Sequence, residues 1–232
     1  MGQNELRMRE GIKTGLPIFI GYFPMAMAFG LLAKAAGGSF MATVSFSVFV
    51  FAGASQFMAI HLLSAGAAAG EIILATFLLN FRHLLMSASL ASRIQEQKSR
   101  WLSLVAFGVT DETFAVASTL PVKPNIRFLL GLEGISYSGW VGGTITGYFL
   151  GSALPLSVQA SMGITLYAMF AAILIPQFKK SWRIVILALG SGALHFFIVT
   201  LKIFPAGWSL IVAMVSAATL GALLFKDEGE AL

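Results

Sequence analysis

Eight long apolar segments follow one another along the chain, and they constrain its fold more than any other feature of the sequence. The connectors between them are short and polar. The segments lie at about residues 14–33, 42–64, 71–91, 101–120, 128–151, 158–178, 184–204 and 206–225. A transmembrane helix needs roughly 20 apolar residues, so each segment is long enough to cross a bilayer. We therefore expect an all-α polytopic membrane protein, with residues 1–232 forming a single transmembrane domain in the lipid bilayer.

The composition excludes a soluble protein and several kinds of chemistry. Only 11% of the 232 residues are charged, whereas soluble domains carry about 25%. The net charge of +5 is not a nucleic-acid signal here, because membrane proteins collect Lys and Arg in their cytoplasmic loops. The sequence has no cysteine, no phosphate-binding loop ending in Gly-Lys-Ser or Gly-Lys-Thr, and three scattered histidines. We expect neither an enzyme nor a metal site, a bound cofactor or a nucleic-acid partner.

A weak internal repeat divides the eight segments into two halves of four, at about residues 14–120 and 128–225. The string Phe51-Ala-Gly-Ala-Ser-Gln56-Phe57 in the second segment is echoed by Phe170-Ala-Ala-Ile-Leu-Ile-Pro-Gln177-Phe178 in the sixth. Chance similarity between apolar helices is the alternative explanation.

The first segment of each half is rich in residues that disturb helices. Residues 14–33 hold Pro17 and Pro24, and residues 128–151 hold seven glycines. Such segments are candidates for broken or re-entrant helices, which membranes tolerate only where they are buried in protein or line a cavity. The excess of Lys and Arg on the inner side of the membrane is also larger if these two segments enter and leave the membrane on the same side. The positive-inside rule therefore favours that arrangement. The halves would then be inverted repeats, an architecture frequent in secondary transporters.

Two polar clusters lie inside apolar segments. The third segment carries Asn80, Arg82 and His83, and the fourth carries the adjacent acids Asp111 and Glu112. A charged side chain at the centre of a transmembrane helix costs about 2.5–3.5 kcal/mol, so such residues persist for function or for pairing. A structural ion pair of Arg82 with one acid leaves the second acid unexplained. That acid would carry a proton or meet a cationic substrate.

Other polar residues are weaker candidates. Gly53, Ser55 and Gln56 in the second segment suit either helix–helix hydrogen bonding or the close approach of a small ligand. Glu133 lies early in the fifth segment, where it could sit at the headgroup level. His61 and His195 are single histidines on apolar segments and fit satisfied core residues better than ligands.

Four motifs in order resemble the AzlC (YgaZ-like) family of branched-chain amino acid exporters. They are Gly15-Leu-Pro17 with Gly21-Tyr-Phe-Pro24, Phe51-Ala-Gly-Ala-Ser-Gln-Phe57, Leu79-Asn80-Phe-Arg82-His83-Leu-Leu85 and Thr110-Asp111-Glu112-Thr-Phe-Ala115. The resemblance covers about residues 11–120. It implies a prokaryotic inner-membrane permease that works with a small AzlD-type subunit. It also implies export of valine, leucine, isoleucine or related apolar amino acids, driven by protons.

The residues are compatible with such a substrate. A zwitterionic amino acid needs a cationic or N–H-rich site for its carboxylate and an anionic site for its ammonium. Half-helix N-termini of the broken first and fifth segments, the first of which holds Pro24, or else Arg82, would serve the carboxylate. Asp111 or Glu112 would serve the ammonium. The alternative function is a passive channel for a small neutral or cationic solute, with Asp111 and Glu112 as its selectivity element. A non-catalytic membrane subunit is a further alternative.

Overall fold

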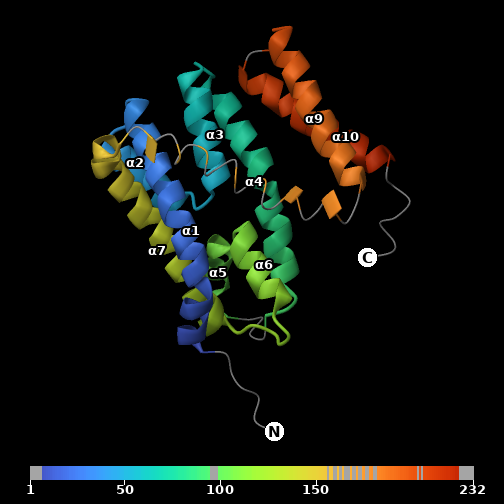
Figure 1. The fold of residues 1–232 in the computed structure, drawn as a ribbon. Coiled ribbons are helices and arrows are strands. Elements are labelled where there is room, and N and C mark those ends of the chain that lie inside the picture. Colours follow the sequence, from blue (N-terminus) through green and yellow to red (C-terminus); the bar gives the residue numbers. More distant parts are fainter. Residues whose placement is uncertain are drawn as a thin grey trace. The chain divides into compact units, whose positions relative to one another are not determined.

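The computed structural model describes residues 7–94, 99–155, 182–202 and 206–224, together with residue 204 and isolated residues between 157 and 179 (Figure 1). Helices and no strand occur in these parts of the chain. In chain order they are α1 (Met8–Ala35), α2 (Phe40–Phe49), α3 (Gly53–Ser64), α4 (Ala69–Ala91), α5 (Leu102–Gly108), α6 (Asp111–Thr119), α7 (Ile126–Leu150), the short 3-10 helix η1 (Gly151–Ala153), α9 (Trp182–Thr200) and α10 (Ala206–Leu224). The all-α class is confirmed. The expected segment at 158–178 falls largely outside the described residues.

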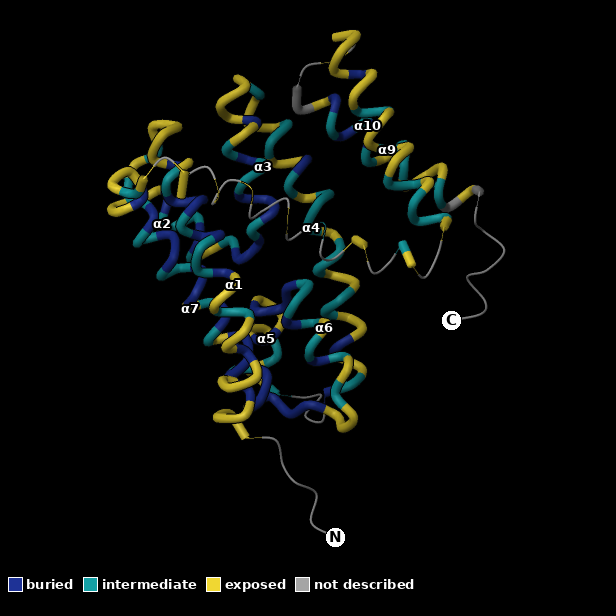
Figure 2. Tube along the Cα trace, viewed as in Figure 1, coloured by how far each residue is buried: buried dark blue, intermediate teal, exposed yellow. Residues whose placement is uncertain are grey.

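The helices divide into two compact units, each considered by itself. Unit 1 comprises Met1–Ile60 and Asn80–Leu166, and unit 2 comprises His61–Leu79 and Tyr167–Leu232. Three of the described helices, Met8–Ala35, Ala69–Ala91 and Trp182–Thr200, are long and apolar enough to cross a membrane. Much of α9 and α10 is exposed, including large apolar side chains, whereas α1 and α7 share a buried stripe (Figure 2). This pattern fits a protein whose outer surface faces lipid.

The expectation that the first segment of each half is broken is wrong. Both α1 and α7 are continuous helices, of 28 and 25 residues, although α1 contains Pro17 and Pro24. Their glycines instead let the two main chains touch. A Cβ atom at Gly147 would lie 2.0 Å from the carbonyl oxygen of Met27, and one at Gly11 would lie 2.0 Å from that of Phe128. We call this contact the glycine seam; its members are Gly11, Gly15 and Gly30 on α1 and Gly131, Gly139, Gly143 and Gly147 on α7. Small residues at such positions are the usual means by which membrane helices approach closely.

The glycine seam also fixes the relative direction of the two helices. Contacts begin with Gly11 beside Phe128 and end with Met27 beside Gly147, so α1 and α7 run parallel. Inverted halves require antiparallel first helices, and the structure therefore contradicts the inverted, re-entrant arrangement. The basic residues that precede or begin these helices, such as Arg7 and Arg127, consequently lie at the same end of the pair.

Two other segments are the interrupted ones. Residues 50–52 lie outside any helix between α2 and α3, with Val50 at φ −123° and ψ 84°. Residues 109 and 110 are extended between α5 and α6. Both interruptions lie beside α7, one helical turn apart. The Phe51 ring is 5.3 Å from that of Tyr137, and Gly108 packs against Glu133.

Candidate functional site

The start of α6 is held in place by its own threonines. Thr110 is the N-cap residue, and its Oγ1 accepts a hydrogen bond from the Thr113 amide at 3.3 Å. The Thr113 hydroxyl lies 2.8 Å from the Thr110 amide, which donates to it, and itself donates to the carbonyl of Gly108 at 3.1 Å. This reciprocal capping ends one helix and begins the next within two residues. It presents Asp111 and Glu112 in the first turn of α6, where the helix dipole favours negative charge.

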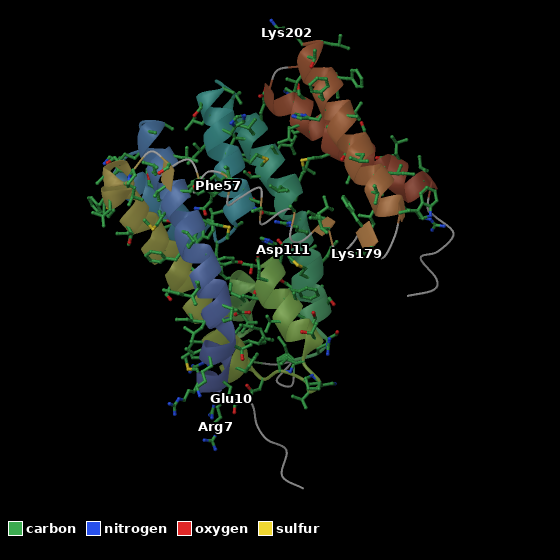
Figure 3. The ribbon with its side chains drawn as sticks, viewed as in Figure 1. Arg7, Glu10, Phe57, Asp111, Lys179 and Lys202 are labelled. Atoms are coloured by element: carbon green, nitrogen blue, oxygen red, sulfur yellow. The ribbon has the colours of Figure 1, made fainter. Side chains whose placement is uncertain are left out.

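Arg82 on α4 pairs with the first of these acids. Its Nη2 lies 3.0 Å from Asp111 Oδ2, within salt-bridge distance. The pair is partly accessible, because 35% of the Arg82 side chain and 23% of the Asp111 side chain remain exposed. Arg82 Nε is buried and has no hydrogen-bond partner. Asp111 points toward α4 in unit 1 (Figure 3). The predicted pairing of Arg82 with an adjacent acid is present.

Glu112 has a different partner, which the sequence reading missed. The hydroxyl of Tyr22 on α1 donates to Glu112 Oε2 at 2.5 Å and lies 2.8 Å from Thr110 Oγ1. Tyr22 is buried, with its ring edge-on to Phe51 and Trp140. In the sequence it is a phenol hydroxyl inside an apolar segment and the second residue of the motif Gly21-Tyr-Phe-Pro24. Tyr22 therefore joins the seam helix α1 to the interruption between α5 and α6.

The remaining candidates of the third segment lie on α4. Ser55 on α3 donates to Asn80 Oδ1 at 2.5 Å, which links the two helices. His83 is half-buried beside Arg82. Asn80, Arg82 and His83 therefore lie close together in unit 1, and only Arg82 reaches the acids through a salt bridge in the part of the chain described.

Gln56 and Gly53 belong to a buried hydrogen-bonded cluster. Gln56 donates to Ser47 Oγ at 3.0 Å and accepts from the indole N–H of Trp140 at 2.6 Å. Ser47 in turn lies 2.7 Å from Thr144 Oγ1. A Cβ atom at Gly53 would lie 2.4 Å from the Trp140 ring, so the absence of a side chain at Gly53 leaves room for the indole. These contacts join α2 and α3 to α7, and the two partners of Gln56, Ser47 on α2 and Trp140 on α7, were not anticipated.

Glu133 and Pro24 lie elsewhere around the interruptions. Glu133 is buried within α7 and packs against Gly108 at the end of α5, rather than at an exposed helix end. Pro24 is half-buried inside the continuous helix α1, two residues after Tyr22. No group of three or more His, Asp or Glu able to hold a metal occurs in the described ranges.

Apolar helices of membrane-spanning length, two interrupted helices and a partly accessible charged cluster at one interruption define a polytopic membrane protein of the transporter class. The chain belongs to the AzlC family, whose model, described as AzlC protein, matches residues 17–154. This range runs from α1 to η1 and contains every candidate site residue, which confirms the resemblance seen in the sequence.

Named relatives place the family in prokaryotic membranes. The inner membrane protein YgaZ of Escherichia coli (strain K12) is 40% identical over 80% of this chain and 79% of its own length. An uncharacterized membrane protein of Archaeoglobus fulgidus is 37% identical over 96% of this chain and 95% of its own. The branched-chain amino acid transport protein AzlC of Bacillus subtilis (strain 168) is 26% identical over 74% of this chain and 68% of its own. No solved structure matches the chain significantly. The chain is thus a multi-pass membrane protein, and its family indicates membrane transport.

Proposed function

We propose that this protein is a secondary transporter that exports branched-chain or related apolar amino acids, coupled to protons, together with a small AzlD-type membrane subunit. The observation that carries the proposal is the partly accessible Arg82–Asp111 pair beside Glu112 at the interruption between α5 and α6. Charges of both signs at one point of a membrane protein match the two charged ends of a zwitterion.

Each end of an amino acid has a group to meet. Its carboxylate can bind the partly exposed Arg82 guanidinium, since arginine binds carboxylates through a planar fork of N–H groups. Its ammonium can bind Asp111 or Glu112. The Phe51 and Phe107 rings, 6.4 Å apart, lie near the same interruption and offer apolar contact to a side chain.

The second acid argues against a purely structural role for the cluster. Arg82 and Asp111 balance each other's charge, so helix packing does not require Glu112. Glu112 is instead held by the neutral hydroxyl of Tyr22, which can be exchanged for a substrate ammonium. The substrate class follows the printed name of the Bacillus subtilis relative. The export direction, proton coupling and AzlD-type partner follow the family resemblance.

Transport in proteoliposomes tests the proposal. The protein is reconstituted with and without the small subunit, and labelled valine, leucine, isoleucine and methionine are followed in counterflow and under an imposed pH gradient. We expect counterflow of the branched-chain substrates and uphill accumulation driven by the gradient. Downhill movement alone would identify a passive channel, and no movement under any condition would reject a transport role for this chain.

Asp111→Asn ties the activity to the site. A hydrogen bond to a charged group is worth about 1.5–3 kcal/mol, so we expect counterflow to fall by at least about tenfold. Glu10→Gln also replaces a carboxylate with its amide, at an exposed residue in the first turn of α1. This variant is the matched control and should transport normally. The double variant Arg82→Asp with Asp111→Arg restores a pair but reverses it. Full transport by that double variant would show that the pair only holds α4 and α6 together.

A further inference from the structure

Glu133 on α7 is the one buried acidic residue in the described part of the chain, with 4% of its surface exposed. Its Oε2 atom is fully buried and has no hydrogen-bond partner. Buried polar atoms in proteins are almost always hydrogen-bonded, and an unpaired buried charge is costly. This carboxyl group therefore needs a specific explanation.

The space for Glu133 is made by a glycine at the interruption. A Cβ atom at Gly108 would lie 2.6 Å from both Cβ and Oε2 of Glu133, so any other residue at 108 would collide with the acid. Gly108 is the last residue of α5, and its position is set by the Thr113 hydroxyl that donates to its carbonyl. The Glu133 side chain thus lies directly against the end of one half-helix.

The helices packed against α7 offer Glu133 no free charged partner. They are α1, α2, α3, α5 and α6; α2 and α5 carry no charged side chain, and the titratable residue of α3 is His61. On α6, Asp111 pairs with Arg82 and Glu112 is bound by Tyr22 of α1. The hydroxyl of Tyr137, the next titratable group along α7, donates to the carbonyl of Val48. The charged side chains of α1 and α7 that remain are exposed: Arg9, Glu10, Lys13 and Lys34 on α1, and Arg127 on α7.

The end of α5 favours an acid that keeps its proton. The last four carbonyl groups of a helix have no helical partner and act only as acceptors. A carboxylic acid can donate its O–H to such groups, whereas a carboxylate cannot. An ionised group at this position would also face the unfavourable end of the helix dipole.

From this geometry we infer that Glu133 is the proton-carrying group of the transporter, separate from the substrate-binding cluster of Arg82, Asp111 and Glu112. The inference rests on the proposed function. In the described conformation the carboxyl is protonated and closed off by Gly108. When the end of α5 moves away, the carboxyl O–H bond breaks and its proton passes to water. The carboxylate keeps the electron pair until a proton from the other side restores the acid.

Separating exchange from gradient-driven transport tests the inference. Glu133→Gln keeps the shape of the side chain but cannot release a proton. We expect this variant to keep valine counterflow within about twofold of the wild type and to lose at least tenfold of the uphill accumulation driven by a pH gradient. Glu133→Asp, which can ionise, should recover part of the uphill activity, whereas Asp111→Asn should lose both activities.

The outcomes distinguish the inference from the proposed function. A wild-type protein without counterflow would reject the proposed function itself. Uphill transport by Glu133→Gln, or loss of counterflow by it, would overturn only the proton role of Glu133. The infrared C=O band of a protonated carboxylic acid gives a second readout that needs no substrate. It should be present in the wild type and in Asp111→Asn, absent in Glu133→Gln and shifted in Glu133→Asp; a band that none of the Glu133 variants alters would contradict the inference.

Discussion

The glycine seam and the two interruptions are both unusual for membrane helices, yet the helix-disturbing residues gather in the continuous helices and not in the broken ones. The helix α1 carries Pro17 and Pro24, and α1 and α7 together carry most of the glycines of unit 1, yet both remain helical throughout. The helices are interrupted instead at residues 50–52, which include Phe51, and at residues 109–110, which include Thr110. In this protein the glycines of α1 and α7 mark close packing, whereas a capping threonine followed by two acids marks the break between α5 and α6.

The physical difference lies in what satisfies the main chain. Within the seam, the intrahelical hydrogen bonds persist and the absent side chains allow main-chain contact. At the α5–α6 interruption, the buried hydroxyls of Thr110 and Thr113 replace the missing helical partners, and the neighbouring acids Asp111 and Glu112 stay partly accessible. Within unit 1, close packing is thus the role of α1 and α7, whereas the polar groups that could bind a solute lie at the start of α6.

The largest expected effect comes from filling the seam. Gly147→Ala places a methyl group 2.0 Å from the Met27 carbonyl oxygen, and because that neighbour is main chain, α1 and α7 must separate. Overpacking typically costs about 1–3 kcal/mol, and we expect the upper end of this range. Gly134→Ala on the same helix is the matched control, since a Cβ there meets nothing within 4 Å. It should be neutral or stabilising by up to about 1 kcal/mol.

Thermal unfolding of the purified variants in detergent measures this difference. Equal midpoints for Gly147→Ala and Gly134→Ala would mean that main-chain contact does not hold the seam, and the comparison with the interruptions would collapse.

An intermediate effect is expected from Tyr22→Phe, which removes the hydroxyl that connects the seam to the interruption. Glu112 then loses its donor, and the loss of a hydrogen bond to a charged group corresponds to about 1.5–3 kcal/mol. We expect counterflow to fall by about tenfold or more. Tyr148→Phe removes a hydroxyl that donates to the Gly38 carbonyl at 3.1 Å, near the other end of α7, and should leave transport unchanged. Equal transport by both variants would separate Tyr22 from the site.

The smallest effect is expected from Thr110→Ala, which removes the cap of α6. Loss of an N-cap side chain costs about 0.5–2 kcal/mol. Ser39→Ala removes the corresponding cap of α2, where the hydroxyl accepts from the Ala42 amide, and should cost a similar amount of stability. Only Thr110→Ala should also weaken counterflow, by a few-fold, because it loosens the turn that carries Asp111. Identical transport by the two cap variants would show that α6 keeps its geometry without Thr110.

Hydropathy and charge carried most of the sequence-based prediction. The apolar runs locate α1, the α2–α3 pair, α4, the α5–α6 pair, α7, α9 and α10 to within a few residues, because a bilayer demands long uninterrupted apolar stretches. The partnership of Arg82 with an adjacent acid was also predictable, since three ionisable residues in adjacent apolar segments have few other partners.

The failures concern contacts between residues far apart in the sequence. Whether Gly147 disturbs a helix or admits a neighbour depends on Met27, which lies 120 positions earlier. Tyr22 and Trp140 gain their roles only when α1 and α7 bring them to Glu112 and Gln56. Local composition contains no trace of these partners.

Main-chain contact along α1 and α7 finally limits how this protein can change shape. Sliding one helix along the other by less than a glycine repeat would press a Cβ atom into a main-chain oxygen at several levels at once. The two helices consequently behave as one rigid body and do not slide along each other. Bending is left to the non-helical residues at 50–52 and 109–110, which lie one helical turn apart along the same face of α7.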